Sequence, residues 1–350
     1  MRLEVRIEKR LANFLLKSEF TAEQDTFALL GASGCGKTMT LKCIAGIEKP
    51  DRGRIVLGDR VLYDSEQRIC LPARERKVGY LFQNYALFPN MTVRKNVYCA
   101  TTDREYADEL IRQFCIEDVA DQYPAELSGG QSQRTALARM LVTRPEVLLL
   151  DEPFAALDNH MRTRMEHVIL DILQEYGGPS VIVTHDRNEA YRMAGRIGVM
   201  EAGRIVEQKE KKEFFDHPET VAAARLTGCK NISRIEKRNG KWYASDWGFP
   251  IAVPKDRDMS GITHLGLRAH YFRYTTSDTE DTIRCRLQRV IEDAFSVVIC
   301  FTAEGNESDS PDALLTWICN TDTWNEVKEQ VLSGSFRLQP DPEKLLYLTR

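Results

Sequence analysis

The stretch GASGCGKT, from Gly31 to Thr38, constrains the fold of this chain more than any other part of the sequence. It follows the apolar run TFALL and precedes MTLKCIAGI, whose apolar residues have helical spacing. Glycines here let backbone N–H groups approach an anion, and the following helix adds its positive end. Lys37 would neutralise the β- and γ-phosphates of a nucleotide, and the Thr38 hydroxyl would bind Mg²⁺. The nucleotide contacts expected from this loop are Gly31, Ser33, Gly34, Cys35, Gly36, Lys37 and Thr38.

A second feature is the run VLLL, which ends in Asp151 and Glu152. A continuous apolar run is typical of a strand buried on both faces of a parallel sheet. Two carboxylates at its end would be costly without cations or polar partners. A DE pair before a proline is, by itself, more often a loop pair, but the buried run and the upstream phosphate loop favour a site. Asp151 then suits the Mg²⁺ shell, and Glu152 suits a general base that activates water.

Two other predicted strands end in polar residues: SVIVT precedes His185, and RKVGYLFQ ends at Gln83. Taken alone, His185 would be a structural histidine and Gln83 a solvated glutamine. At strand ends of an α/β sheet, His185 could instead contact a γ-phosphate or the attacking water, and the Gln83 amide could bind Mg²⁺ or position water. The catalytic candidates are therefore Glu152, His185 and Gln83, and the candidate Mg²⁺ ligands are Thr38, Gln83 and Asp151.

The stretch LSGGQSQR, residues 127 to 134, lies just before the helical sequence QSQRTALARMLVT. Ser128, Gly129 and Gly130 would again offer backbone N–H groups and a helix dipole to an anion. An N-cap serine followed by glycines for the turn would explain the local geometry, but not the whole set of motifs in the chain. The chain has one lysine-bearing loop and one DE strand, so a second complete nucleotide site is not encoded. This second phosphate-binding segment, the clamp, would then bind the nucleotide of another chain.

The order of the elements predicts two domains. Strands alternating with helices indicate an α/β fold for residues 1–228, with a helical subdomain at about 85–145. From residue 229 to residue 350, short alternating segments such as SVVICFTA indicate a small all-β barrel or sandwich.

Composition excludes several classes of function. The net charge of −4 offers no basic excess for nucleic acid. The nine cysteines form no C-x-x-C pair, which argues against a zinc site or disulfide framework and for a reducing, cytosolic compartment. No apolar run approaches the roughly 18 residues of a membrane span. Any membrane role would therefore be by docking.

The segments GASGCGKT, LFQNYALFPNMTV, LSGGQSQRTALARML, LLLDEPFAALD and IVTHD resemble, in this order, the motifs of ATP-binding cassette (ABC) transporter ATPases over about residues 1–228. The resemblance implies the P-loop NTPase fold, ATP and Mg²⁺ as cofactors, and a head-to-tail homodimer that sandwiches two ATP molecules. It also implies that Ser128, Gly129, Gly130 and Gln131 contact the partner's ATP, and that Asp158 lies in the loop coupling the two sites. Two departures are Ser132, where many relatives have glutamine, and the absence of a tyrosine or tryptophan before Gly31, with Phe14 closer to that glycine than the family's adenine-stacking aromatic.

The C-terminal stretch, especially HLGLRAHYF, resembles the TOBE domain, an OB-like fold, of importer ATPases. The resemblance implies integral membrane permease subunits, which contact the residues after Gln83 including 85–88, an extracytoplasmic solute-binding protein, and a peripheral place on the cytoplasmic face of the membrane. The cassette and this tail together look most like molybdate or sulfate importer ATPases, with polyamine, ferric-ion and sugar importers as alternatives. A non-transport ABC ATPase is the alternative class. The C-terminal domain would either bind a regulatory oxyanion or only support the dimer.

Overall fold

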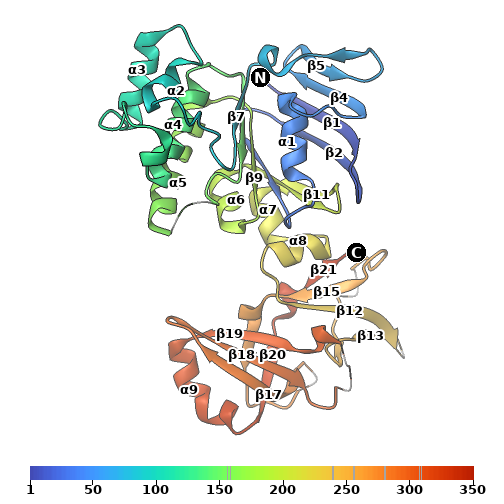
Figure 1. Cartoon of the computed structure of the whole chain (residues 1–350). Helices are drawn as coiled ribbons and strands as arrows, with labels where there is room; N and C mark the ends of the chain where they lie inside the picture. Colours follow the sequence, from blue (N-terminus) through green and yellow to red (C-terminus); the bar gives the residue numbers. More distant parts are fainter. Residues whose placement is uncertain are drawn as a thin grey trace. The chain divides into compact units, whose positions relative to one another are not determined.

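The computed structural model describes residues 1–155, 157, 159–238, 240–254, 257–279, 281–306, 308 and 310–350. The chain divides into two compact units, Met1–Lys211 and Lys212–Arg350 (Figure 1). This division lies earlier than the boundary after residue 228 expected from the sequence, which stays a prediction. Among the described residues, no helix is both long enough and apolar enough to cross a bilayer.

The first unit is built on an 11-stranded sheet in the order β6-β5-β4-β1-β2-β11-β10-β3-β9-β8-β7. Its strands are β1 (Leu3–Arg10), β2 (Leu15–Ala22), β3 (Thr26–Leu30), β4 (Arg52–Leu57), β5 (Arg60–Asp64), β6 (Ile69–Cys70), β7 (Val78–Leu81), β8 (Val147–Asp151), β9 (Ser180–Thr184), β10 (Arg196–Glu201) and β11 (Arg204–Glu210). Strands β10, β3, β9, β8 and β7 pair in parallel. All residues of β3, β8 and β9 are buried, as their apolar runs predict.

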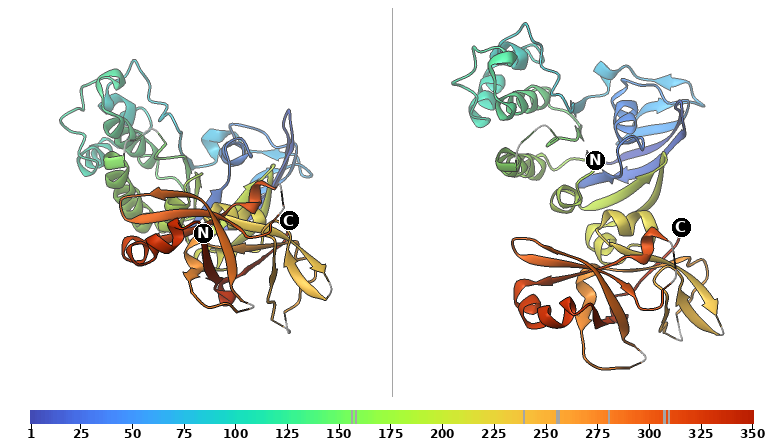
Figure 2. Two further views of the ribbon diagram at one scale, coloured as in Figure 1. Left: turned by 90° about the horizontal axis from the view of Figure 1, so that it is seen from below. Right: turned by 60° about the horizontal axis from the view of Figure 1, so that its bottom comes forward.

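The helices of the first unit are α1 (Lys37–Ala45), α2 (Val93–Tyr98), α3 (Arg104–Gln113), α4 (Gly129–Leu141), α5 (Asn159–Tyr176) and α6 (Arg187–Met193), and α7 (Lys211–Asp216) begins at its end. Helices α2, α3 and α4 pack against one another, and the helical subdomain at about residues 85–145 stays a prediction. Figure 2 shows this group, in teal and green, apart from the blue strands β1, β2, β4 and β5. Helices α1 and α4 lie on opposite sides of β7 (Figure 1).

The second unit contains two five-stranded sheets, ordered β14-β13-β12-β15-β21 and β16-β20-β17-β18-β19. Its elements are α8 (Val221–Leu226), β12 (Asn231–Arg238), β13 (Lys241–Ala244), β14 (Phe249–Ile251), β15 (His264–Leu267), β16 (Phe272–Tyr274), β17 (Ile283–Glu292), β18 (Ser296–Ala303), β19 (Leu315–Asn320), α9 (Thr321–Leu332), β20 (Ser335–Pro340) and β21 (Leu346–Leu348). Asn231 joins the sheets, because its side chain bonds both the N–H and the carbonyl of Thr316 on β19, at 2.7 and 2.8 Å. The β-rich fold agrees with the sequence analysis.

Helix α9 departs from the all-β expectation for this domain. The Asn320 side chain caps its first turn by accepting a bond from Thr323 N. Trp324, Val327 and Val331 are buried at helical spacing. The capping residue and this spacing were visible in the sequence, but the strands on either side dominated the pattern.

Candidate functional site

The loop between β3 and α1 forms a cradle for an anion. The N-cap of α1, Gly36, supplies no side-chain cap, and the first turn holds no acidic residue. Gly34 and Gly36 have φ angles of 81° and 113°, a region that favours glycine. A Cβ at Gly31 would lie 2.3 Å from the Met200 carbonyl oxygen, so this position also requires glycine. An uncapped helix N-terminus behind a glycine loop fits a bound phosphate group.

Lys37 lies inside this cradle. Its ammonium group donates to the carbonyls of Gly31 and Ala32, at 2.8 and 2.9 Å, and the side chain is buried. In the described part of the chain, no ion pair joins Lys37 to a carboxylate. It also lies 3.8 Å from Cys35 Sγ, within hydrogen-bonding distance for sulfur. A buried ammonium whose partners are two carbonyls and a sulfur gains a stronger partner when an anion enters the loop.

Asp151, at the end of β8, is held by two hydroxyl donors. Thr38 Oγ1 donates to Asp151 Oδ1 and the Tyr80 hydroxyl donates to Oδ2, both at 2.8 Å. Burial and the neighbouring carboxylate raise the pKa of Tyr80, so its hydroxyl keeps the proton it donates. The carboxylate is 3% exposed, and neither partner is charged. This arrangement fits a Mg²⁺ site formed by Thr38 and Asp151, since Mg²⁺ prefers one or two carboxylates together with phosphate oxygens.

The three expected catalytic side chains meet beside this pair. Gln83 Nε2 donates to Glu152 Oε2 at 3.3 Å, and His185 Nδ1 lies 3.5 Å from the same oxygen. These residues follow β7, β8 and β9, which are neighbours in the parallel sheet. Because parallel strands end at the same edge, the fold brings the three side chains together. Here Gln83 contacts the carboxylate of Glu152, not that of Asp151.

Glu152 has an unusual backbone. Its φ angle is +44°, in the left-handed region that costs a non-glycine residue about 1–3 kcal/mol. Its N–H donates to the Val183 carbonyl at 3.0 Å, and its carbonyl accepts from Ala155 N at 3.2 Å. Such strain persists only where the surroundings hold it, which is common at active sites.

The segment after Gln83 is fastened to the helical subdomain. Arg139 on α4 donates to the Tyr85 carbonyl at 2.9 Å and lies over the Phe88 ring, 5.2 Å from its centroid. The buried Asn96 side chain accepts from Phe88 N and donates to the Phe88 carbonyl. Phe88 itself is 46% exposed. The segment thus presents an aromatic side chain to solvent from a fixed backbone.

The second clamp begins α4. The Ser128 hydroxyl accepts from Gln131 N at 3.3 Å, and Ser128 N donates to Gln131 Oε1 at 2.8 Å, forming a reciprocal capping box. A Cβ at Gly130 would lie 2.2 Å from Met161 Cε. Helices α4 and α1 lie on opposite sides of β7 (Figure 1), and the expected contact of this clamp with the nucleotide of another chain stays a prediction. Gly129 is the first residue of α4, and Asp158 lies outside the described residues.

Sequence reasoning missed several residues that shape the site. The sequence indicates Tyr80 only as part of a predicted strand. Thr184 Oγ1 donates to Glu189 Oε2 at 2.5 Å and accepts from Asp186 N at 2.9 Å, which fixes the turn that carries His185. Burial raises the pKa of Glu189, and the bond from Thr184 partly offsets it. The sequence feature that could have indicated this turn is the glutamate, Glu189, four residues after His185.

Phe14 lies close to the phosphate loop. Its Cε2 atom is 3.5 Å from the position of a Cβ built on Gly36, and its ring also packs beside Gly203. The ring is partly buried against the core of the first unit. Three aromatic residues precede Gly31 in the sequence: Phe14, Phe20 and Phe27. Of these, Phe14 lies beside the loop, although it is closer to Gly31 in the sequence than the family's adenine-stacking aromatic.

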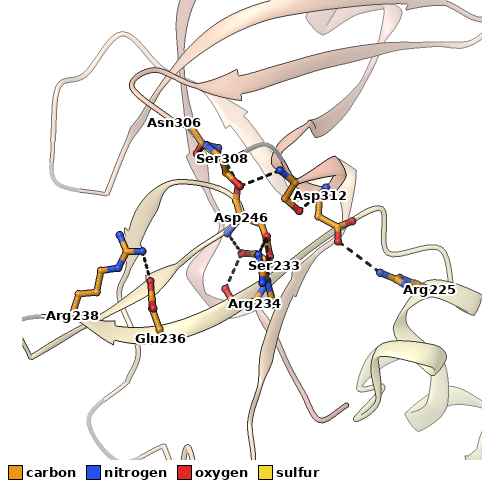
Figure 3. A network of polar contacts seen from close by, with 10 residues as sticks. Arg225, Ser233, Arg234, Glu236, Arg238, Asp246, Asn306, Ser308 and Asp312 are labelled. Atoms are coloured by element: carbon orange, nitrogen blue, oxygen red, sulfur yellow. Dashed lines mark hydrogen bonds and ion pairs between the residues drawn. The ribbon is translucent and has the colours of Figure 1, made fainter.

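The second unit holds a polar cavity of about 630 Å³. Two arginines line it, and each is paired with a carboxylate: Arg234 with Asp246, at 2.7 Å, and Arg238 with Glu236 (Figure 3). Among its described residues the cavity thus offers an oxyanion no unpaired cation. The hypothesis of a regulatory oxyanion gains no support from this cavity and stays a prediction.

Comparisons relate this chain to known ATP-binding proteins of transporters. A family model described as ABC transporter matches residues 18–155. The putrescine transport ATP-binding protein PotG of Escherichia coli is 41% identical over 59% of this chain and 56% of its own length. The sulfate/thiosulfate import ATP-binding protein CysA 2 of Agrobacterium fabrum is 38% identical over 81% of this chain and 83% of its own. A dimeric structure of the ATP-binding cassette MJ0796, bound to ADP and Pi, covers 60% of this chain and 99% of its own, with 26% identity and a TM-score of 0.51.

Proposed function

The chain belongs to the ABC transporter family, and on that premise we propose that it binds and hydrolyses ATP to drive a transporter. One observation carries the proposal: Glu152, Gln83 and His185 converge beside the Thr38–Asp151 pair, next to the loop that contains Lys37. A phosphate cradle, a cation site and a candidate base thus occupy one edge of the sheet.

In this proposal each residue has a defined task. Lys37 leaves its two loop carbonyls and binds the β- and γ-phosphates. Thr38 and Asp151 would hold Mg²⁺, which would supply positive charge to neutralise the phosphates. Glu152 orients the attacking water and accepts its proton. Gln83 and His185 orient the Glu152 carboxylate and contact the water or the γ-phosphate.

The clamp formed by Ser128, Gly129, Gly130 and Gln131 acts on the nucleotide of a second copy of the chain. The observation that supports this is the position of α4 across β7 from α1, together with the dimeric form of the cassette MJ0796. Asp158 would lie between the two sites. The resulting homodimer would have two composite sites, each with a phosphate loop from one chain and a clamp from the other.

Glu152→Gln tests the assignment of the base. The amide has nearly the same shape and cannot accept the proton, so we expect kcat to fall about 10²- to 10⁴-fold while ATP still binds. The measurement is steady-state phosphate release beside equilibrium binding of radiolabelled ATP. Near-normal turnover by the variant would remove Glu152 as the base. If the variant also failed to bind ATP, its loss of turnover would not identify Glu152 as the base.

We propose that the transporter is an importer and that its solute is an oxyanion, sulfate or molybdate. The match to the sulfate/thiosulfate protein extends over 81% of this chain, further than the 59% of the putrescine protein. Membrane permease subunits would dock at residues 85–88 on the cytoplasmic face, and a solute-binding protein would deliver the solute. The test is the molybdenum and sulfur uptake of cells carrying the native chain or Glu152→Gln. A deficit that excess molybdate or sulfate rescues supports the oxyanion, and a deficit in polyamine, iron or sugar uptake instead would replace it.

A further inference from the structure

We propose that Gln133 is a positioning residue for Glu152, and that it ties the clamp offered to the partner's nucleotide to the base of the chain's own site. The inference rests on the proposed ATP hydrolysis. Gln133 is not a part of the phosphate loop, the cation site or the clamp. The proposal uses its position on α4, next to the clamp in the sequence and in contact with the turn that follows β8.

The first step is the contact itself. Gln133 is fully buried, and its Nε2 donates to the Pro153 carbonyl at 2.8 Å. Among the described residues, its Oε1 has no hydrogen-bond partner. A buried amide with one unsatisfied atom is costly, and an apolar side chain of the same length would pack here at lower cost. The bond to Pro153 is therefore the one contribution that requires a glutamine.

The second step is the strain at Glu152. Its left-handed backbone is held by its N–H bond to Val183 and by the bond from Ala155 to its carbonyl, both between backbone groups. The next carbonyl along the chain, that of Pro153, is held by Gln133. Among the described residues, Gln133 is the side chain from outside this turn that bonds its backbone. Removing the bond lets the turn relax, and the carboxylate then leaves the water it must orient.

The third step is the helix that carries Gln133. Helix α4 begins with the capping box of Ser128 and Gln131, and the Thr135 hydroxyl bonds the Gln131 carbonyl at 2.8 Å. The clamp and Gln133 therefore lie on adjacent turns of one continuous helix. A shift of the clamp when it closes on the partner's nucleotide moves the donor that holds Pro153. Each Glu152 would then be positioned according to whether its own chain's clamp is engaged.

The test compares Gln133→Met with Gln113→Met in the full-length protein. Methionine matches the length of Gln133 and cannot donate, whereas Gln113 is exposed at the end of α3 and serves as the matched control. We expect Gln133→Met to lower kcat about ten- to a hundredfold, as a misplacement near 1 Å can, with ATP affinity and KM unchanged. Without nucleotide, amide hydrogen exchange in residues 150–155 should be faster than in the native chain for Gln133→Met, but not for Gln113→Met.

A double variant separates positioning from general damage. If Gln133 acts through Glu152, Gln133→Met causes no further loss of kcat in the Glu152→Gln background. Three results would each overturn the inference. The first is a further loss of kcat in the Glu152→Gln background as large as the loss in the native background. The others are an unchanged kcat or unchanged hydrogen exchange for Gln133→Met in a protein whose native chain is active. A native chain without ATPase activity would contradict the proposed function instead, and the exchange experiment would still decide the role of Gln133.

Discussion

The Tyr80 hydroxyl lies 2.8 Å from Asp151 Oδ2, on the side of the carboxylate opposite the Thr38 hydroxyl. Both hydroxyl donors to this buried carboxylate are neutral, and no ion pair joins it to a cation in the part of the chain that the structure describes. Such a site favours binding of a cation, because the carboxylate that would bind Mg²⁺ is already desolvated and oriented. Tyr80 therefore belongs to the support of the proposed cation site, although it was not among the predicted ligands.

Replacing Tyr80 by phenylalanine should leave Oδ2 of Asp151 without its donor. We expect the free energy of unfolding of the nucleotide-free protein to fall by about 1–3 kcal/mol, the cost of an unsatisfied buried charged group. Scanning calorimetry in the absence of Mg²⁺ measures it. Tyr98→Phe is the matched control, since Tyr98 bonds Asp108, whose side chain is 37% exposed and can turn to water. Equal losses for the two variants would contradict the role assigned to burial.

The two glycine loops should respond differently to alanine. In Gly31→Ala the new methyl group meets the Met200 carbonyl oxygen, which is backbone and cannot turn aside, so we expect a loss of about 1–3 kcal/mol or more. In Gly130→Ala it meets only the terminal methyl of Met161, a flexible side chain, so stability should change by less than about 1 kcal/mol. Urea unfolding measures both. A Gly130→Ala protein that is folded but without ATPase activity would place Gly130 in the clamp, whereas full activity would argue against that role.

Asp246 should make the second unit sensitive to acid. Burial alone would raise the pKa of this carboxyl, but hydrogen bonds from Arg234 and Ser310 outweigh burial and lower the pKa. A lowered folded-state pKa contributes stability above the ordinary value, near pH 4, and that contribution is lost as the pH falls through the folded-state value. Asp246→Asn should therefore cost about 1–3 kcal/mol at neutral pH, and the difference from the native chain should shrink below about pH 4.

Tryptophan fluorescence isolates this effect, because all four tryptophans of the chain lie in the second unit. Urea unfolding followed by this signal at several pH values gives the two stability curves. A constant difference down to pH values well below 4 would contradict the assignment to Asp246.

The sequence predicted those parts of the site that depend on strand ends. The apolar run before Asp151 predicted a buried strand of a parallel sheet, and SVIVT predicted a strand before His185. The structure places these strands, β8 and β9, side by side, and the sheet edge brings Glu152 together with Gln83 and His185. The supporting contacts were not predictable, because they join residues far apart in the sequence: Tyr80 with Asp151, Gln133 with Pro153, and Arg139 with Tyr85. A tyrosine in a strand or a glutamine in a helix carries no local sign of its distant partner.

Mixing two inactive variants tests the central claim, that each ATP site is formed by the phosphate loop of one chain and the clamp of another. Lys37→Ala disables the loop, and Ser128→Arg disables the clamp. In a mixed dimer, the loop of the second variant faces the clamp of the first, and that site is intact. We predict that the mixture regains ATPase activity, whereas Lys37→Ala mixed with the double variant Lys37→Ala/Ser128→Arg stays inactive. A mixture of exchanged chains that remains as inactive as its components would contradict the shared site.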